Sequence, residues 1–138
     1  MLEIGPDTYR LRPYDLSKAG GPLQRLSAAG VQITKEGVDQ VRKHIARFEP
    51  SPLNAQMMLR LQQIAEGQRA SNQRDIYYYT HELREYQRYS NLGWESGQPA
   101  EAWEAYVLWN NTHTAALADY HISDADLPTL EWLQGVSR

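Results

Sequence analysis

The 138-residue sequence predicts an all-α fold, a compact single domain of four main helices plus short helices with an extended N-terminal arm. Apolar residues recur every three or four positions in four long segments, which is the period of an amphipathic helix. Capping residues or proline stand at the start of these segments, and glycine follows several of them. The connections between them are about two to eight residues long, as is typical of compact helical domains.

One hydrophobic core is expected, because a chain of this length rarely supports two. The N-terminal arm is interrupted by glycine and proline and allows at most a short strand at Thr8–Leu11. A short helix is predicted from Pro22 to Ala29, since proline suits the first turn of a helix and Gly30 can end it. The expected divisions are an arm at 1–21, a helical core at 22–122 and a tail at 123–138.

Two amphipathic helices are predicted next. Thr34 is expected to cap the first, which ends before Pro50. Ser51 is expected to cap the second, Pro52 opens it, and Gly67 ends it. His44 is placed with the basic side of the first helix, which we expect to be solvated. The apolar stripes are Val38, Val41, Ile45 and Phe48 in the first helix, and Leu53, Met57, Leu61 and Ile64 in the second.

The central helix is expected to start at Ser71 or Asn72 and to end at Leu92, where a glycine follows. A last long helix is expected over residues 99–120, and a short amphipathic piece over residues 130–133. The expected core stripes are Ile76, Tyr79, Leu83 and Tyr86 in the central helix, and Trp103, Tyr106, Asn110, His113, Leu117 and Tyr120 in the last.

The composition excludes several classes of function. There is no cysteine, which rules out disulfides, thiolate nucleophiles and cysteine zinc sites. The formal net charge of −3 argues against a generally basic protein that binds nucleic acid by bulk electrostatics. No apolar run of about eighteen residues occurs and no secretory signal is visible, so no membrane partner is expected.

Residues with chemical potential gather on the central and last helices. His81, Arg84 and Glu85 lie within one helical turn of each other. Asn110 and His113 interrupt the apolar stripe of the last helix, where burial should be deepest. Burying an unpaired amide or imidazole costs about 1–3 kcal/mol, so both need a partner.

Three arrangements of these residues are open. In the first, His81 and His113 are general base and general acid in metal-independent cleavage of RNA, because imidazole titrates near neutral pH. In the second, both histidines bind a divalent metal with Glu82 or Glu85, although Glu85 stands where a His-Glu-x-x-His pair would place its second histidine. In the third, the residues form a structural polar network.

Three segments of the chain form a recognisable pattern. They are Val38 to Phe48; Tyr79-Thr80-His81-Glu82-Leu83-Arg84-Glu85 with Arg88-Tyr89; and Trp109-Asn110-Asn111-Thr112-His113-Thr114-Ala115 with Leu117, Asp119 and Tyr120. This pattern, over roughly residues 35–121, resembles a C-terminal effector domain of bacterial polymorphic toxins of the Rhs and contact-dependent growth inhibition type. The acidic balance departs from that of a free-standing nuclease, and the tail after Tyr120 lies outside the resemblance.

The resemblance implies a toxin module of a larger secreted exoprotein that acts in the cytoplasm of a target cell. A cognate immunity protein would neutralise it, and a host cytoplasmic factor could assist it. Many domains in this position are nucleases, often directed at tRNA, which adds weight to the first arrangement.

The leading hypothesis is therefore a metal-independent ribonuclease toxin without metal or other cofactor. The predicted catalytic residues are His81 and His113 for proton transfer, Arg84 against the phosphate, and Glu82 or Glu85 to orient a histidine. Substrate RNA is expected to contact Tyr77, Tyr78, Arg88, Asn110, Asn111 and Thr112. The rival hypotheses are a non-catalytic helical module that binds another protein and a metal-dependent hydrolase or nuclease toxin.

Overall fold

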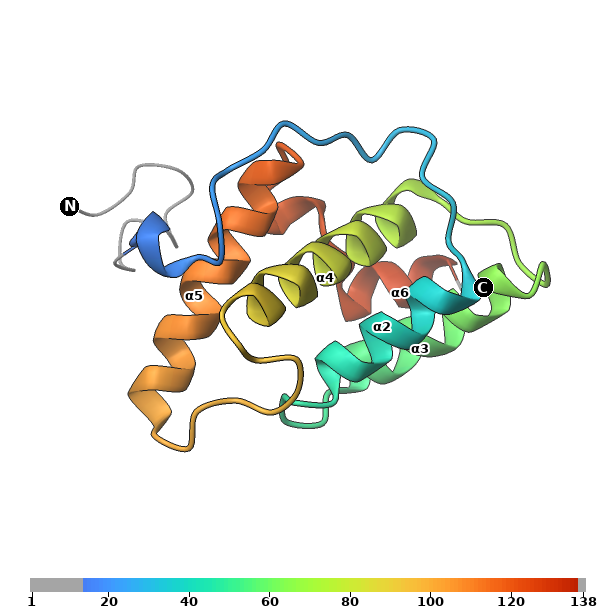
Figure 1. Cartoon of the computed structure of the whole chain (residues 1–138). Coiled ribbons are helices and arrows are strands. Elements are labelled where there is room, and N and C mark those ends of the chain that lie inside the picture. The colour runs from blue at the N-terminus through green and yellow to red at the C-terminus, as the bar shows by residue number, and fades with distance from the viewer. Residues whose placement is uncertain (1–13, 137–138) are drawn as a thin grey trace.

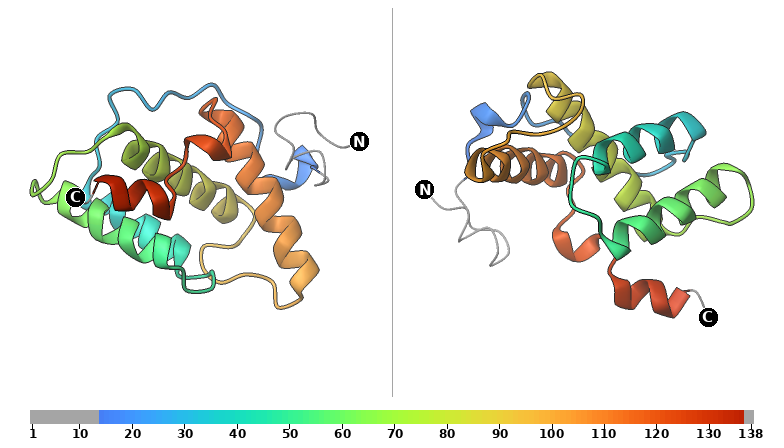
Figure 2. Two further views of the ribbon diagram at one scale, coloured as in Figure 1. Left: turned by 180° about the vertical axis from the view of Figure 1, so that it is seen from behind. Right: turned by 90° about the horizontal axis from the view of Figure 1, so that it is seen from below.

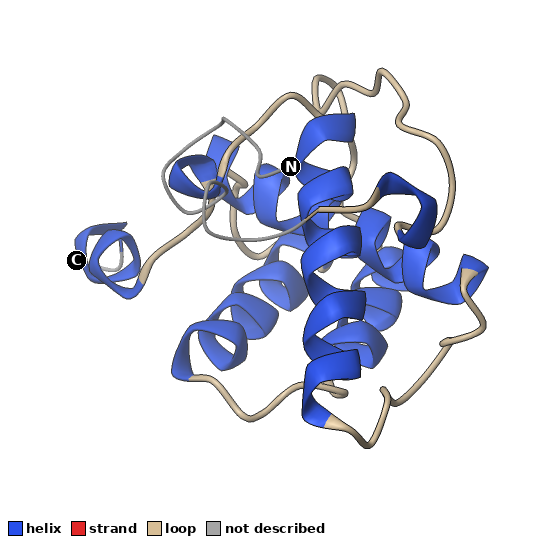
Figure 3. Cartoon of the chain, turned by 90° about the vertical axis from the view of Figure 1, so that its left-hand side faces the viewer, coloured by secondary structure: helices blue, strands red, loops and turns tan. Residues whose placement is uncertain are grey.

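The computed structural model describes residues 14–136, and all regular structure in that range is helical (Figure 3). Four long helices form the body: α2 (Lys35–Ile45), α3 (Pro52–Ala65), α4 (Gln73–Asn91) and α5 (Ala102–Asp119). The shorter elements are α6 (Leu130–Val136) and the 3-10 helices η1 (Leu16–Lys18) and η2 (Asp124–Asp126). The predicted all-α class is confirmed, whereas the strand expected at Thr8–Leu11 lies outside the described residues.

Local capping signals position the starts of the long helices. Thr34 and Ser51 cap α2 and α3 as predicted, and their hydroxyl oxygens accept hydrogen bonds from backbone N–H groups of the first turn. Asn72 precedes α4, and its backbone N–H donates to the Asp75 carboxylate at 3.0 Å. α5 begins later than predicted, because the carboxylate of Glu101 caps it.

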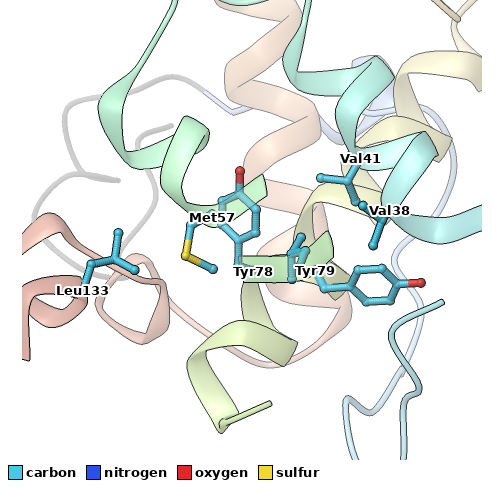
Figure 4. Close-up of a cluster of buried hydrophobic side chains, with 7 residues drawn as sticks. Val38, Val41, Met57, Tyr78, Tyr79 and Leu133 are labelled. Atoms are coloured by element: carbon cyan, nitrogen blue, oxygen red, sulfur yellow. The ribbon is translucent and has the colours of Figure 1, made fainter. Parts of the chain in front are cut away.

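The helix α4 lies between α2 and α5 and packs against both, while α3 packs against α2 and α4 (Figure 1). α6 lies beside α3 (Figure 2), where the Arg60 guanidinium sits over the Trp132 ring at 5.0 Å. A cluster of buried side chains joins α2, α3, α4 and α6 (Figure 4). Each such side chain contributes about 1.5–3 kcal/mol when fully buried. Its members are Val38, Val41, Met57, Leu61, Tyr78, Tyr79 and Leu133.

Residues 22–28 are extended, so the predicted helix from Pro22 to Ala29 is wrong. The segment passes along α5 and α4 before the chain enters α2 (Figure 1). Arg88 donates to three carbonyl groups of residues 19–22 at 2.8–3.0 Å. Two backbone N–H groups of the segment donate to Asp119 at 2.8 Å. Tertiary hydrogen bonds thus replace the helical ones that the proline and glycine signals suggested.

The buried faces of α4 and α5 are more polar than predicted. Of the expected α4 stripe only Tyr79 is fully buried, because neighbouring helices cover α4 on several sides. In α5, Trp103 is 59% exposed. The polar residues buried on α4 and α5 are Asp75, Thr80, His81, Glu85, Arg88, Asn110, Asn111, Thr112, His113 and Asp119. None of the described helices combines the length and apolarity that crossing a bilayer requires.

Candidate metal centre

The carboxylate of Glu85, on α4, is buried and faces three histidine rings. Its Oε2 lies 3.0 Å from His81 Nε2 and 3.1 Å from His113 Nδ1. Its Oε1 lies 2.8 Å from His44 Nε2. His81 stands one turn earlier on the same helix, whereas the other two rings come from α5 and α2, and all four side chains are almost fully buried. The packing of α4 between α2 and α5 therefore gathers groups that are distant in sequence.

Glu85 Oε2, His81 Nε2 and His113 Nδ1 form a nearly equilateral triangle, because the two nitrogens also lie 3.0 Å apart. The two ring nitrogens supply at most two hydrogen atoms to the three sides of this triangle. Whichever nitrogen is protonated, at least one side brings together two donors or two acceptors. Hydrogen bonding alone therefore does not account for the geometry.

A cation among the three atoms does account for it. Two ligand atoms that each lie about 2.1 Å from a metal ion are about 3.0 Å apart when the ligand–metal–ligand angle is 90°. They are about 3.4 Å apart when that angle is tetrahedral. The observed separations of 3.0–3.1 Å match the right-angled case. Two histidines and one carboxylate are also an established ligand set for zinc and for iron. The residues present thus fit a divalent transition metal.

The carboxylate of Asp124, in η2, fixes the orientation of the His113 ring. Its Oδ1 accepts a hydrogen bond from His113 Nε2–H at 2.8 Å, since an ionised carboxylate can only accept. A neutral His113 ring then has its lone pair on Nδ1, which is the atom in the triangle. Carboxylate–histidine pairs of this kind orient imidazoles in metal sites. The ring of Trp109 stacks on the ring of His113, with the two centroids 4.6 Å apart.

The electrostatics of the centre favour positive charge. Burial opposes the ionisation of Glu85, but hydrogen bonds to the three histidines hold its pKa well below its usual range. Burial lowers the pKa of His113, yet hydrogen bonds to Asp124 and Glu85 outweigh it and raise the pKa to about 9. Burial and the nearby charge of Glu85 raise the pKa of Glu82. An ion that binds His113 must displace this proton, so metal binding should weaken as the pH falls.

The predicted catalytic residues divide into two groups. The structure brings His81, His113 and Glu85 together, with Glu82 one turn away on α4. Arg84 lies apart from them and donates through Nε to Asp119 at 2.7 Å. The 3.0 Å distance between the two histidine nitrogens leaves no room for a phosphate between the rings.

The predicted substrate-binding residues lie in separate places. All five N–H groups of Arg88 are used within the protein, by a carboxylate and three carbonyl groups. Tyr78 donates to a side chain of α3, and Thr112 donates to a carbonyl of its own helix. Asn111 accepts a backbone N–H from the segment before η1. Asn110 is buried beside a small cavity next to η1.

Tyr77, the remaining predicted contact, lines an open cavity of about 580 Å³. The walls of this cavity come from residues 26–30, 71–73, 76–77 and 120–122. Tyr77 stands one helical turn before His81 on α4, and Ile122 stands two residues before Asp124, although the lining of the cavity includes neither His81 nor Asp124.

Two members of the centre were not predicted as site residues. The expectation that His44 lies on a solvated face is wrong, because the side chain is fully buried. A signal existed, since His44 follows Val41 by three residues and so shares its core side of α2. Asp124 lies in the tail, where no periodic pattern points to it.

Comparison of the chain with protein-family models, with curated proteins and with solved structures gave no match.

Proposed function

We propose that the protein is a metal-dependent hydrolase that holds its ion with His81, Glu85 and His113. The observation that carries this proposal is the triangle of ligand atoms with sides of 3.0–3.1 Å. Phosphodiester bonds of RNA or DNA are the proposed substrate, because the sequence resembles toxin effector domains of which many are nucleases. The same resemblance supports an immunity protein as the partner and the target-cell cytoplasm as the place of action.

The position of each residue supports a distinct role. His81 and Glu85 present ligand atoms from successive turns of α4, which sets their separation. His113 completes the set from α5, and Asp124 keeps the proton on its far nitrogen. A bound divalent ion would supply a nucleophilic water at neutral pH and stabilise charge on a phosphoryl oxygen. Substrate would approach from the side of Glu82 and Asp124, whose side chains are 14% and 40% exposed.

The cavity beside Tyr77 is the proposed binding site for the rest of the substrate. Its volume of about 580 Å³ lies within the usual range for ligand sites. Stacking of a nucleobase on Tyr77 would contribute about 1–3 kcal/mol. His121 lines the same cavity and adds a hydrogen-bonding ring.

Metal dependence is the decisive test. We expect the purified protein to cleave RNA or DNA with Mn²⁺ or Zn²⁺, to lose this activity in EDTA and to regain it when one ion is returned. Glu85→Gln conserves size but removes the ligand charge, so we expect activity to fall by about 100-fold or more. Glu104→Gln, at an exposed acid on α5, is the matched control and should keep full activity. Full activity in EDTA, or in Glu85→Gln, would contradict the proposal.

The metal-independent ribonuclease predicted from the sequence is the second candidate. The convergence of His81 and His113 supports it, because a proton-transfer pair must share one site. Their 3.0 Å separation argues for the metal instead, since the two groups should flank the phosphorus. Cleavage of RNA that resists EDTA and is abolished by His113→Ala would favour this candidate. Intact nucleic acid in growth-inhibited cells would favour a non-catalytic binding module.

A further inference from the structure

The Glu85 carboxylate has a second oxygen, which belongs to a different group of ligand atoms. Its Oε1 lies 2.8 Å from His44 Nε2, and Glu82 Oε1 lies 3.8 Å from the same nitrogen. Ligand atoms of His44, Glu82 and Glu85 all lie within 4.8 Å of one another. The two carboxylates stand at positions i and i+3 of α4, so they project from one face.

The polar partners of these two carboxylates are histidine rings. In the described part of the chain, neither Glu82 nor Glu85 is hydrogen-bonded to a lysine or arginine. The neighbouring arginines are engaged elsewhere: Arg84 and Arg88 pair with Asp119, and Arg47 donates to carbonyl groups of residues 94–97 at 2.8–3.2 Å. Two neighbouring carboxylates that are largely removed from water, with only imidazole rings as polar partners, favour a cation between them.

The ring of His44 is held in place to meet such a cation. It is fully buried and lies edge-on to Phe48 and Tyr89, with centroid distances of 5.2 and 4.9 Å. Its Nδ1 has no hydrogen-bond partner among residues 14–136, so Nε2 makes the polar contacts of the ring. That nitrogen points at Glu85 Oε1.

We propose that His44, Glu82 and Glu85 bind a second divalent ion, so that the Glu85 carboxylate bridges two ions with one oxygen on each. This inference rests on the proposed function, because it takes the ion at His81 and His113 as given. Two-metal sites that act on phosphate esters hold their ions about 3.5–4 Å apart. The pair of ions would clamp the attacking and leaving oxygens of a phosphodiester, which the first ion alone does not provide.

The test is to load the full chain with Mn²⁺ alone and to measure both stoichiometry and spin coupling. We expect equilibrium dialysis to give two Mn²⁺ per wild-type chain and the electron paramagnetic resonance spectrum to show an exchange-coupled pair. His44→Phe and Glu82→Gln should each bind one Mn²⁺ and give the spectrum of an isolated ion. Glu36→Gln, at an exposed acid on α2, is the matched control and should retain the coupled pair.

The outcomes separate the two proposals. One Mn²⁺ per wild-type chain, unchanged in Glu82→Gln, would overturn the second ion and leave the first. Two uncoupled ions that persist in Glu82→Gln would overturn the bridge. A chain that binds no Mn²⁺ would overturn the proposed function as well. Glu82 is partly exposed, so Glu82→Gln keeps the test independent of core packing if His44→Phe does not fold.

Discussion

At the scale of single residues, Gly37 in the first turn of α2 lies directly against the side chain of Tyr79. The position is buried and faces the ring of Tyr79, whose hydroxyl lies near Thr34. A β-carbon at residue 37 would overlap both the hydroxyl and the ring of Tyr79. Space therefore requires glycine here, although glycine weakens a helix.

Gly37→Ala should lower the free energy of unfolding by about 1–3 kcal/mol, because an overpacked core must shift to admit the methyl group. This loss should exceed the gain of about 1 kcal/mol that alanine offers in a helix. Denaturant unfolding measures the change. Gly135→Ala in α6, where a β-carbon meets no other atom, is the control and should be neutral or stabilising. Equal stability of Gly37→Ala and wild type would show that Tyr79 can move aside.

Part of the candidate site could be predicted residue by residue. His81, Glu85 and His113 each place a polar group on or beside an apolar helix face, and such groups require partners. His44 was wrongly assigned to the solvated face because basic side chains flank it on α2, although its spacing from Val41 indicated the core side. Asp124 follows a break in the helical pattern, and only the folded chain brings it to His113.

At the scale of structural elements, Arg88 determines the path of the chain between η1 and α2. Its side chain is fully buried and donates twice to Asp119 and three times to carbonyl groups of residues 19–22. Asp119 in turn accepts from the backbone of the extended segment. One ion pair between α4 and α5 thus holds a third segment against both helices.

Arg88→Met should destabilise the protein by about 3–5 kcal/mol, because it removes the main partner of a buried carboxylate. Arg88→Lys should restore little, since three ammonium donors cannot serve five contacts. Urea unfolding measures both variants. Arg42→Met, which breaks an exposed ion pair with Asp39, should change stability by less than about 1 kcal/mol. A loss that small for Arg88→Met would mean that the segment is held by other contacts.

The elements that could be predicted are those whose signals are local. Caps at Thr34, Ser51 and Asn72 lie beside the helices that they start, so sequence patterns located them. The prediction of a helix from Pro22 failed because Arg88, whose hydrogen bonds hold this segment outside a helix, is distant from it in sequence. Tertiary hydrogen bonds overrode a weak local preference.

At the scale of the whole molecule, the candidate centre connects α2, α4 and α5. Its ligand atoms come from three helices, which are separated in sequence by α3 and by the loop before α5. The complete ligand set therefore exists only in the folded chain. Binding of an ion should stabilise the fold by mass action, because the unfolded chain lacks the site.

Mn²⁺ should raise the melting temperature of the wild-type protein, and EDTA should reverse the increase. At a free ion concentration one hundred times the dissociation constant, the stabilisation is about 2.7 kcal/mol. Thermal unfolding with and without the ion measures the shift. Glu85→Gln should show little or no shift, whereas Glu104→Gln should behave like wild type. An equal shift in Glu85→Gln would place the stabilising ions elsewhere.

The stacking of Trp109 on His113 gives the candidate centre an optical reporter. The two rings lie 25° from parallel with their centroids 4.6 Å apart, so the charge on the imidazole acts directly on the indole. Tryptophan emission is sensitive to such a neighbour, and occupancy of His113 could therefore be followed by fluorescence without any label. The difference between wild type and Trp109→Phe would isolate this signal from the other three tryptophans.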